Sequence, residues 1–111
     1  MWEPTISIRN KRTYDGPGVY VGRPTALGNP FKVGVHGSRD EVVEKYRAWL
    51  EEAMDGDNPA MLMFTVMFDE LVRDGEMTLI CWCAPKRCHA EVIKELLREA
   101  WRELKEEEKW R

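Results

Sequence analysis

The chain has 111 residues, of which 43% are hydrophobic and 33% are charged, as is usual for one globular domain. Its net charge of −3 excludes a uniformly basic protein that coats DNA. The longest apolar run, 60–68, is far shorter than the roughly 20 residues of a membrane-spanning helix, and the N-terminus lacks the pattern of a signal peptide. We therefore expect one cytoplasmic domain over 1–111 that has no membrane partner.

The charge is unevenly distributed along the chain. Residues 1–37 hold five basic and two acidic side chains, so the remainder carries a surplus of six negative charges. A basic segment of this kind either lines a site for a small anion or a short stretch of nucleic acid, or forms a solvated face. The absence of glutamine and the abundance of Glu, Lys and Arg are typical of heat-adapted proteins.

Two short strands are predicted near the N-terminus. Residues 4–8 alternate in polarity, and 19–21 are β-branched and aromatic between two glycines. The next segment, 22–37, contains four glycines and two prolines and is predicted to be a shaped, functional loop.

Two helices follow this loop. Ser38 and Glu41 form a capping box before an apolar pattern, which predicts a helix over about 39–54. Asn58 and Pro59 predict the start of a second helix, and Gly75 marks its end.

The last third of the chain combines a strand and a helix. Residues 77–83 form a continuous apolar run, which is typical of a central strand covered on both faces, and an amphipathic helix is predicted after 88–89. The order of elements predicts an α/β fold, a small single-domain Rossmann-like sandwich. Its short, mostly parallel sheet would be flanked by about three helices.

A candidate site lies in the turn between this strand and the last helix. Ligands of α/β proteins bind where strand carboxyl ends meet helix N-termini, because free N–H groups and the helix dipole attract anions there. Cys88, close to Arg87 and His89, is expected to have a lowered pKa and to be the most readily alkylated cysteine. In an enzyme, Cys88 would be the nucleophile or acid, His89 its proton partner, and Arg23 and Arg87 the charge clamps. Cys83 is the third candidate catalytic residue.

Other interpretations of the three cysteines remain open. They lie too close together for a disulfide framework. Cys81, Cys83, Cys88 and His89 have the chemistry of a zinc site, although the four ligands are unusually close in sequence. Cys81 and Arg87 have a spacing similar to that of phosphatase-like loops, and buried cysteines are also common as small hydrophobic residues. We expect the site to work without a cofactor and without a metal ion.

The segment GRPTALGNPF, 22–31, is the second candidate motif. Its glycines allow close backbone approach or positive φ, and its Arg and Asn offer hydrogen-bond donors. We expect the two motifs to meet at one pocket. The predicted ligand-binding residues are Gly22, Arg23, Gly28, Asn29, Lys32 and Arg87. The alternative is a rigid surface connection anchored by Phe31.

Three segments in this order resemble the family domain of unknown function 4326, which occurs in bacteria, archaea and their viruses. They are VYVGRPTALGNPF, SRDEVVEKYRAWL and CWCAPKRCHAEVI, and they fall within 19–93. The family motif implies a site at Gly22, Arg23, Gly28, Asn29, Pro30, Phe31, Cys81, Cys83, Pro85, Cys88 and His89. CWCAPKRCH is also similar to the cysteine–histidine motif of domain of unknown function 488, which implies an α/β layout with a ligand site there.

The sequence thus predicts a cationic pocket for a phosphate-bearing small molecule, such as a nucleotide, or for nucleic acid. It leaves open a hydrolase or transferase that uses Cys88 and His89. The alternatives are a nucleic-acid-binding module without catalysis and a zinc-stabilised interaction domain.

Overall fold

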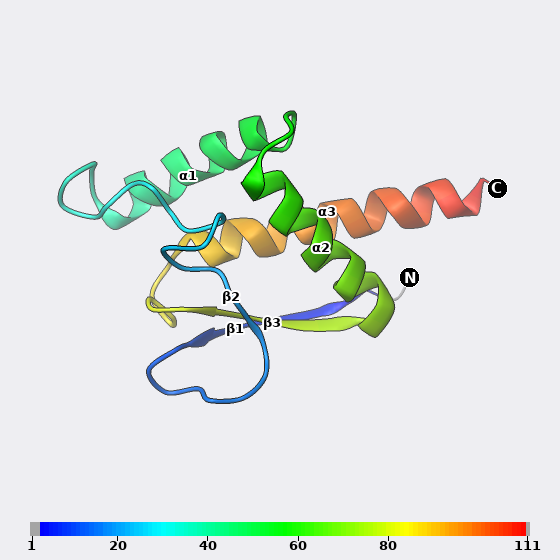
Figure 1. Cartoon of the computed structure of the whole chain (residues 1–111), viewed down its shortest axis with the longest axis horizontal. Helices are drawn as coiled ribbons and strands as arrows, with labels where there is room; N and C mark the ends of the chain where they lie inside the picture. The colour runs from blue at the N-terminus through cyan, green and yellow to red at the C-terminus, as the bar shows by residue number, and fades with distance from the viewer. Residues whose placement is uncertain (1–2, 111) are drawn as a thin grey trace.

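This computed structural model describes residues 3–110 of the chain (Figure 1). This part of the chain contains three strands and three helices. They follow one another as β1 (Thr5–Asn10), β2 (Val19–Tyr20), α1 (Arg39–Ala53), α2 (Pro59–Asp74), β3 (Glu76–Cys81) and α3 (His89–Lys109). None of these helices has the length and apolar character needed to cross a bilayer.

The strands form one parallel sheet in the order β1-β3-β2. Thr5 pairs with Glu76 at one end of β1, and Asn10 pairs with Cys81 at the other. Because all three strands run in the same direction, their carboxyl ends meet at one edge of the sheet. The predicted α/β fold with a short parallel sheet is confirmed.

The helices gather on one face of this sheet (Figure 1). Along β3, Met77, Leu79 and Cys81 are buried toward the helices, whereas Thr78 and Ile80 remain half-buried. The second face is crossed by the connection 11–18, which must pass β3 because β1 and β2 lie on either side of it. The expectation of a strand covered equally on both faces is therefore wrong, since no helix lies on the second face in the described part of the chain.

Local sequence determines where the helices begin and end. Ser38 accepts a hydrogen bond from the N–H of Glu41, and the Glu41 carboxylate accepts one from the N–H of Ser38. Asn58 caps α2 by accepting from the N–H of Met61, and Gly75 ends that helix with φ +75°. These caps confirm the predicted helix boundaries to within a residue or two.

The loop that follows β2 folds back tightly on itself at Gly28. A Cβ atom at this position would lie 2.9 Å from the backbone nitrogen of Arg23 and 3.1 Å from the carbonyl carbon of Gly22. Gly28 thus allows two backbone segments to touch, and its φ is not in the left-handed region.

We predict that Gly28→Ala lowers the free energy of unfolding by about 1–3 kcal/mol, because a methyl group must push apart two packed backbone segments. Gly56→Ala is the matched control, since its Cβ would lie 3.9 Å from the nearest backbone atom, the Ala53 oxygen, and 3.2 Å from one side-chain atom, Nδ2 of Asn58. Urea unfolding of both variants measures the difference. Equal stability of the two would contradict the close-approach role of Gly28.

Candidate functional site

A cavity of about 290 Å³ opens at the carboxyl edge of the sheet. Its wall combines the segment after β2, the start of α1 and the turn between β3 and α3. Three arginines, three aromatic residues, two cysteines and a histidine take part, together with small and aliphatic residues. The complete lining is Tyr20, Gly22, Arg23, Asn29, Phe31, Val33, Arg39, Val42, Val43, Trp82, Cys83, Arg87, Cys88 and His89.

The structure brings the two predicted motifs together at this cavity. Gly22, Arg23 and Asn29 come from the first motif, and Cys83, Arg87, Cys88 and His89 come from the second. Among residues 3–110, the lining does not include Gly28 or Lys32. Gly28 is a backbone packing position, and Lys32 belongs to an exposed turn in which its N–H donates to Nδ1 of His36. The ligand-binding role expected for these two residues has no support from their positions.

The hydrogen bonds of Asn29 stabilise the conformation of the first motif. Its Oδ1 accepts from the N–H of Phe31 at 2.9 Å, and its Nδ2 donates to the carbonyl of Val42 at 3.3 Å. Its own carbonyl accepts from Nε of Arg23 at 2.8 Å. Asn29 therefore fixes the loop against α1 and orients Arg23, which differs from the predicted role as a donor to ligand.

The second motif is held by Asn10, a residue that sequence reasoning missed. Its Nδ2 donates to the carbonyl of Trp82 at 3.0 Å and to that of Ala84 at 2.8 Å. Asn10 ends β1 beside Cys81, so its amide can satisfy two carbonyls that lie outside the sheet ladder. The only sequence signal was an asparagine at the end of a predicted strand, which is common in proteins.

Strand β3 ends at Cys81, two residues earlier than predicted. Trp82 and Cys83 thus belong to the turn, and both line the cavity. Trp82 is 52% exposed, and its Nε1 donates to the Tyr20 hydroxyl at 2.9 Å. The Tyr20 hydroxyl in turn donates to the carbonyl of Arg23 at 2.6 Å. This chain of hydrogen bonds joins the two motifs at the cavity rim.

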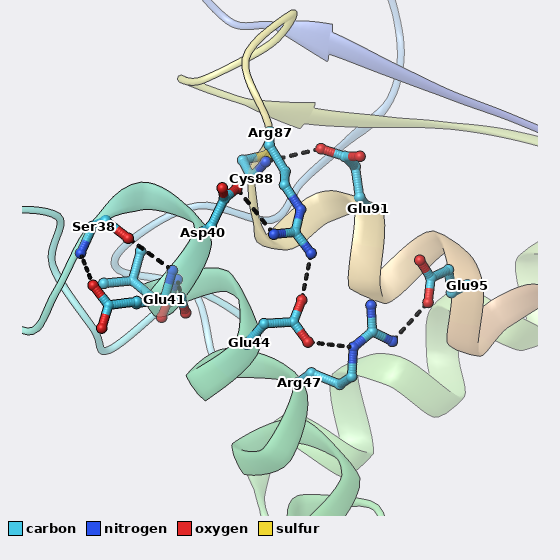
Figure 2. A network of polar contacts seen from close by, with 11 residues as sticks. Ser38, Asp40, Glu41, Glu44, Arg47, Arg87, Cys88, Glu91 and Glu95 are labelled. Atoms are coloured by element: carbon cyan, nitrogen blue, oxygen red, sulfur yellow. Dashed lines mark hydrogen bonds and ion pairs between the residues drawn. The ribbon is translucent and has the colours of Figure 1, made fainter.

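Cys88 is the N-cap of α3 and is buried. Its sulfur accepts from the N–H of Ala90 at 3.4 Å, and its own N–H donates to the Glu91 carboxylate at 3.0 Å (Figure 2). These contacts use N–H groups at the helix start that were expected to be free for an anion. The helix end is therefore capped from within the protein.

The thiol of Cys88 also donates to the sulfur of Cys81, with the two Sγ atoms 3.4 Å apart. This hydrogen bond lowers the pKa of Cys81 to about 6, with additional stabilisation of the thiolate by the N–H groups of Ala84 and Cys83. The same contact raises the pKa of Cys88, and burial adds to that increase. The prediction of a lowered pKa at Cys88 is wrong, because its neighbour Cys81 holds the charge and Cys88 supplies the proton.

His89 follows directly and is buried against the first motif. Its Nε2 lies 2.6 Å from the carbonyl oxygen of Val21, which can only accept, so Nε2 carries the proton. The ring packs edge-on against Tyr46, with centroids 5.0 Å apart. Burial lowers the pKa of His89, and the nearby Arg23 adds to this effect. The ring is therefore neutral at pH 7, with Nδ1 as its unprotonated nitrogen.

Arg87 reaches across to α1, where two carboxylates bind it (Figure 2). It donates to Asp40 at 3.0 Å and to Glu44, and the hydrogen bond from Arg87 lowers the pKa of Glu44. Arg47 extends the network from Glu44 to Glu95 on α3. Because its charge is already neutralised, Arg87 is a structural link between the turn and α1, and its predicted role as a clamp for an anion is weakened.

Arg39 is the cationic residue of the cavity that sequence reasoning missed. It is half-buried at the start of α1, and its Nη1 donates to the carbonyl of Arg87 at 3.1 Å. Neither Arg39 nor Arg23 takes part in an ion pair within residues 3–110. Both therefore keep their positive charge at the cavity.

The zinc hypothesis has no geometric support. No group of three or more His, Cys, Asp or Glu side chains in residues 3–110 is placed to hold a metal ion. The sulfurs of Cys81 and Cys88 bind each other, and Nε2 of His89 donates to a carbonyl. Three of the four proposed ligands, Cys81, Cys88 and His89, are thus engaged in other contacts.

The chain belongs to the family described as a domain of unknown function, DUF4326, whose model matches residues 6–99. The match covers both motifs and confirms the resemblance drawn from the sequence. No curated protein and no solved structure matches the chain.

We predict that the free energy of unfolding falls as the pH drops below 6.5, the usual pKa of histidine, by at most about 1.4 kcal/mol per pH unit from His89. Below pH 6.5 His89 takes up a proton in the unfolded chain, whereas the buried ring of the folded chain stays neutral. The contribution of His89 to the free energy of unfolding is therefore complete above pH 6.5 and is lost as the pH falls toward the lowered pKa. His89→Gln keeps a donor for Val21 and should flatten this part of the profile.

Urea unfolding at pH 7.5, 6.5 and 5.5 measures the effect. His36→Asn, whose Oδ1 can replace Nδ1 as the acceptor for the N–H of Lys32, measures separately what the other histidine contributes. A profile of His89→Gln parallel to that of the wild type would show that His89 is not held neutral by the fold.

Proposed function

We propose that the cavity binds a nucleotide, with the phosphate against Arg23 and Arg39 and the base against Trp82. The observation that carries this proposal is that a cavity lined by aromatic side chains holds two arginines that have no carboxylate partner among residues 3–110. Proteins that bind single-stranded nucleic acid without sequence preference usually combine cationic side chains with aromatic rings on which the bases stack. The ligand is either a free nucleotide or the end of a nucleic-acid strand.

The placement of the two arginines supports binding of a phosphate. Arg23 uses Nε on the carbonyl of Asn29, and Arg39 uses Nη1 on the carbonyl of Arg87. Each backbone bond orients the guanidinium and leaves further N–H groups for a ligand. Hydrogen bonds between arginine and phosphate are charge-assisted, and each contributes more than a neutral bond.

Trp82 supports binding of a base. More than half of its surface is exposed, although the hydrogen bonds of its Nε1 and of its carbonyl restrain it. An exposed tryptophan held in one orientation loses little conformational entropy when a base stacks on it. Tyr20, which lies beside it, also receives the ammonium of Lys11 at 5.1 Å from the ring centroid, so the rim is cationic as well.

The size of the cavity limits the ligand. A volume of about 290 Å³ lies at the lower end of the range for sites that bind small molecules. One nucleotide unit fits this size better than a dinucleotide. A strand could therefore place only its terminal nucleotide inside.

The observations support binding more than catalysis. Cys88, the expected nucleophile, caps α3 and keeps its proton in a hydrogen bond to Cys81. His89 bonds to Val21 and does not lie in a hydrogen bond with Cys88. A hydrolase or transferase built on a Cys88–His89 pair would need these two side chains to exchange a proton directly.

We predict that Arg23→Ala and Arg39→Ala each weaken the binding of AMP by about tenfold, because each removes a charge-assisted contact with phosphate. Lys32→Ala is the matched control and should change affinity less than about twofold, since Lys32 lies outside the cavity. Titration calorimetry with AMP, adenosine and a 5′-phosphorylated oligonucleotide measures the effect. Binding of the oligonucleotide alone would identify a strand end as the ligand, whereas unchanged affinity in both arginine variants would overturn the proposal.

We predict that AMP quenches the fluorescence of Trp82 on binding. Trp82→Phe should lose most of the quenching and bind several times more weakly, because stacking of a base on an aromatic ring contributes about 1–3 kcal/mol. Trp110→Phe changes a tryptophan that is 78% exposed on the far end of α3, and should quench as the wild type does. Full quenching in Trp82→Phe would place the base elsewhere.

A further inference from the structure

The two buried cysteines of the β3–α3 turn are neighbours in space. Cys81 is the last residue of β3 and is completely buried, and Cys88 is the N-cap of α3 with 3% of its surface exposed. Their sulfurs lie 3.4 Å apart and share a hydrogen bond. Two thiols at this separation need to approach by only about 1.4 Å to reach the length of a disulfide bond.

Binding of a nucleotide does not call for two thiols at this junction. A cysteine in a core usually packs as a small hydrophobic residue, and a serine or an alanine would cap or fill this junction with less chemical reactivity. The paired sulfurs also share one proton, so one of them is available as a thiolate beside the start of a helix. Thiolates in such places are the sulfur species that react with oxidants.

A small oxidant can reach the pair through the cavity. Cys88 lines the cavity wall, as does Cys83, which is half-buried and lies in the turn between the paired cysteines. The cavity volume of about 290 Å³ easily admits a molecule as small as hydrogen peroxide. A bulky disulfide would not reach the fully buried Cys81.

We propose that Cys81 and Cys88 form a redox-active dithiol that hydrogen peroxide oxidises to an intramolecular disulfide. A proton shift along their hydrogen bond moves the negative charge from Cys81, where it rests, to Cys88, the sulfur that lines the cavity, and the Cys88 sulfur then attacks one oxygen of the peroxide. An S–O bond forms, the O–O bond breaks, and the departing hydroxide takes up a proton from the solvent and leaves as water.

The second step closes the disulfide. The Cys81 sulfur attacks the sulfenic acid of Cys88, an S–S bond forms, the S–O bond breaks, and the thiol proton leaves with the second water. Two thiols thus lose two hydrogen atoms and two electrons, and one peroxide becomes two water molecules. The product closes the turn 82–87 covalently, and a dithiol reductant reverses it. This inference does not depend on the proposed nucleotide binding.

Mass spectrometry of the native protein tests the proposal. After treatment with a small excess of hydrogen peroxide, the intact chain should lose the mass of two hydrogen atoms, and dithiothreitol should restore it. Lys86 and Arg87 lie between the two cysteines, so trypsin separates them into the peptides 74–86 and 88–94. The oxidised protein should yield these peptides joined, with fragment ions that place the bond on Cys81.

Cys83 serves as the internal control, because it shares a peptide with Cys81. Cys83→Ser should still lose two hydrogen atoms and yield the joined peptides, whereas Cys81→Ser and Cys88→Ser should not form the Cys81–Cys88 link. The wild-type measurement and Cys83→Ser decide the outcome even if a buried variant fails to fold. A bond from Cys83 to Cys88 in the native wild type would overturn the proposal. Oxidation of Cys83 to sulfinic acid without any link would do the same.

Discussion

The junction between β3 and α3 is the contact on which the rest of the structure depends. Cys88 caps the helix with its sulfur and touches Cys81 at the end of the strand, and His89 donates to the carbonyl of Val21 behind β2. Asn10, at the end of β1, holds the carbonyls of the intervening turn. All three strand ends thus meet around this junction, which determines where the cavity forms and which side chains line it.

The cavity is basic although the chain is acidic, and pairing explains the difference. Arg87 forms ion pairs with carboxylates of α1, as Figure 2 shows. Arg23 and Arg39 donate instead to backbone carbonyls, which are neutral. A guanidinium bound to a carbonyl is oriented without being neutralised. The sign of a site therefore depends on the partners of each arginine, and the net charge of the chain does not predict it.

Much of the site could be predicted from the sequence, but its chemistry could not. Both motifs were identified and do meet at one cavity, since the carboxyl ends of parallel strands share an edge. Arg39 was missed because it follows an ordinary helix cap. The roles of Cys88 and Arg87 changed because each has a partner, Cys81 and Asp40 respectively, that a linear pattern does not reveal.

The sequence by itself determined the features that depend on neighbours within a few residues. The capping box at Ser38, the start of α2 at Asn58 and its end at Gly75 follow from local hydrogen bonds and backbone freedom, so they were predicted correctly. Only the tertiary structure decided which thiol holds the proton and which arginines among residues 3–110 lack a carboxylate partner. These properties depend on side chains from separate elements, and the distances between them exist only after the sheet and helices have packed together.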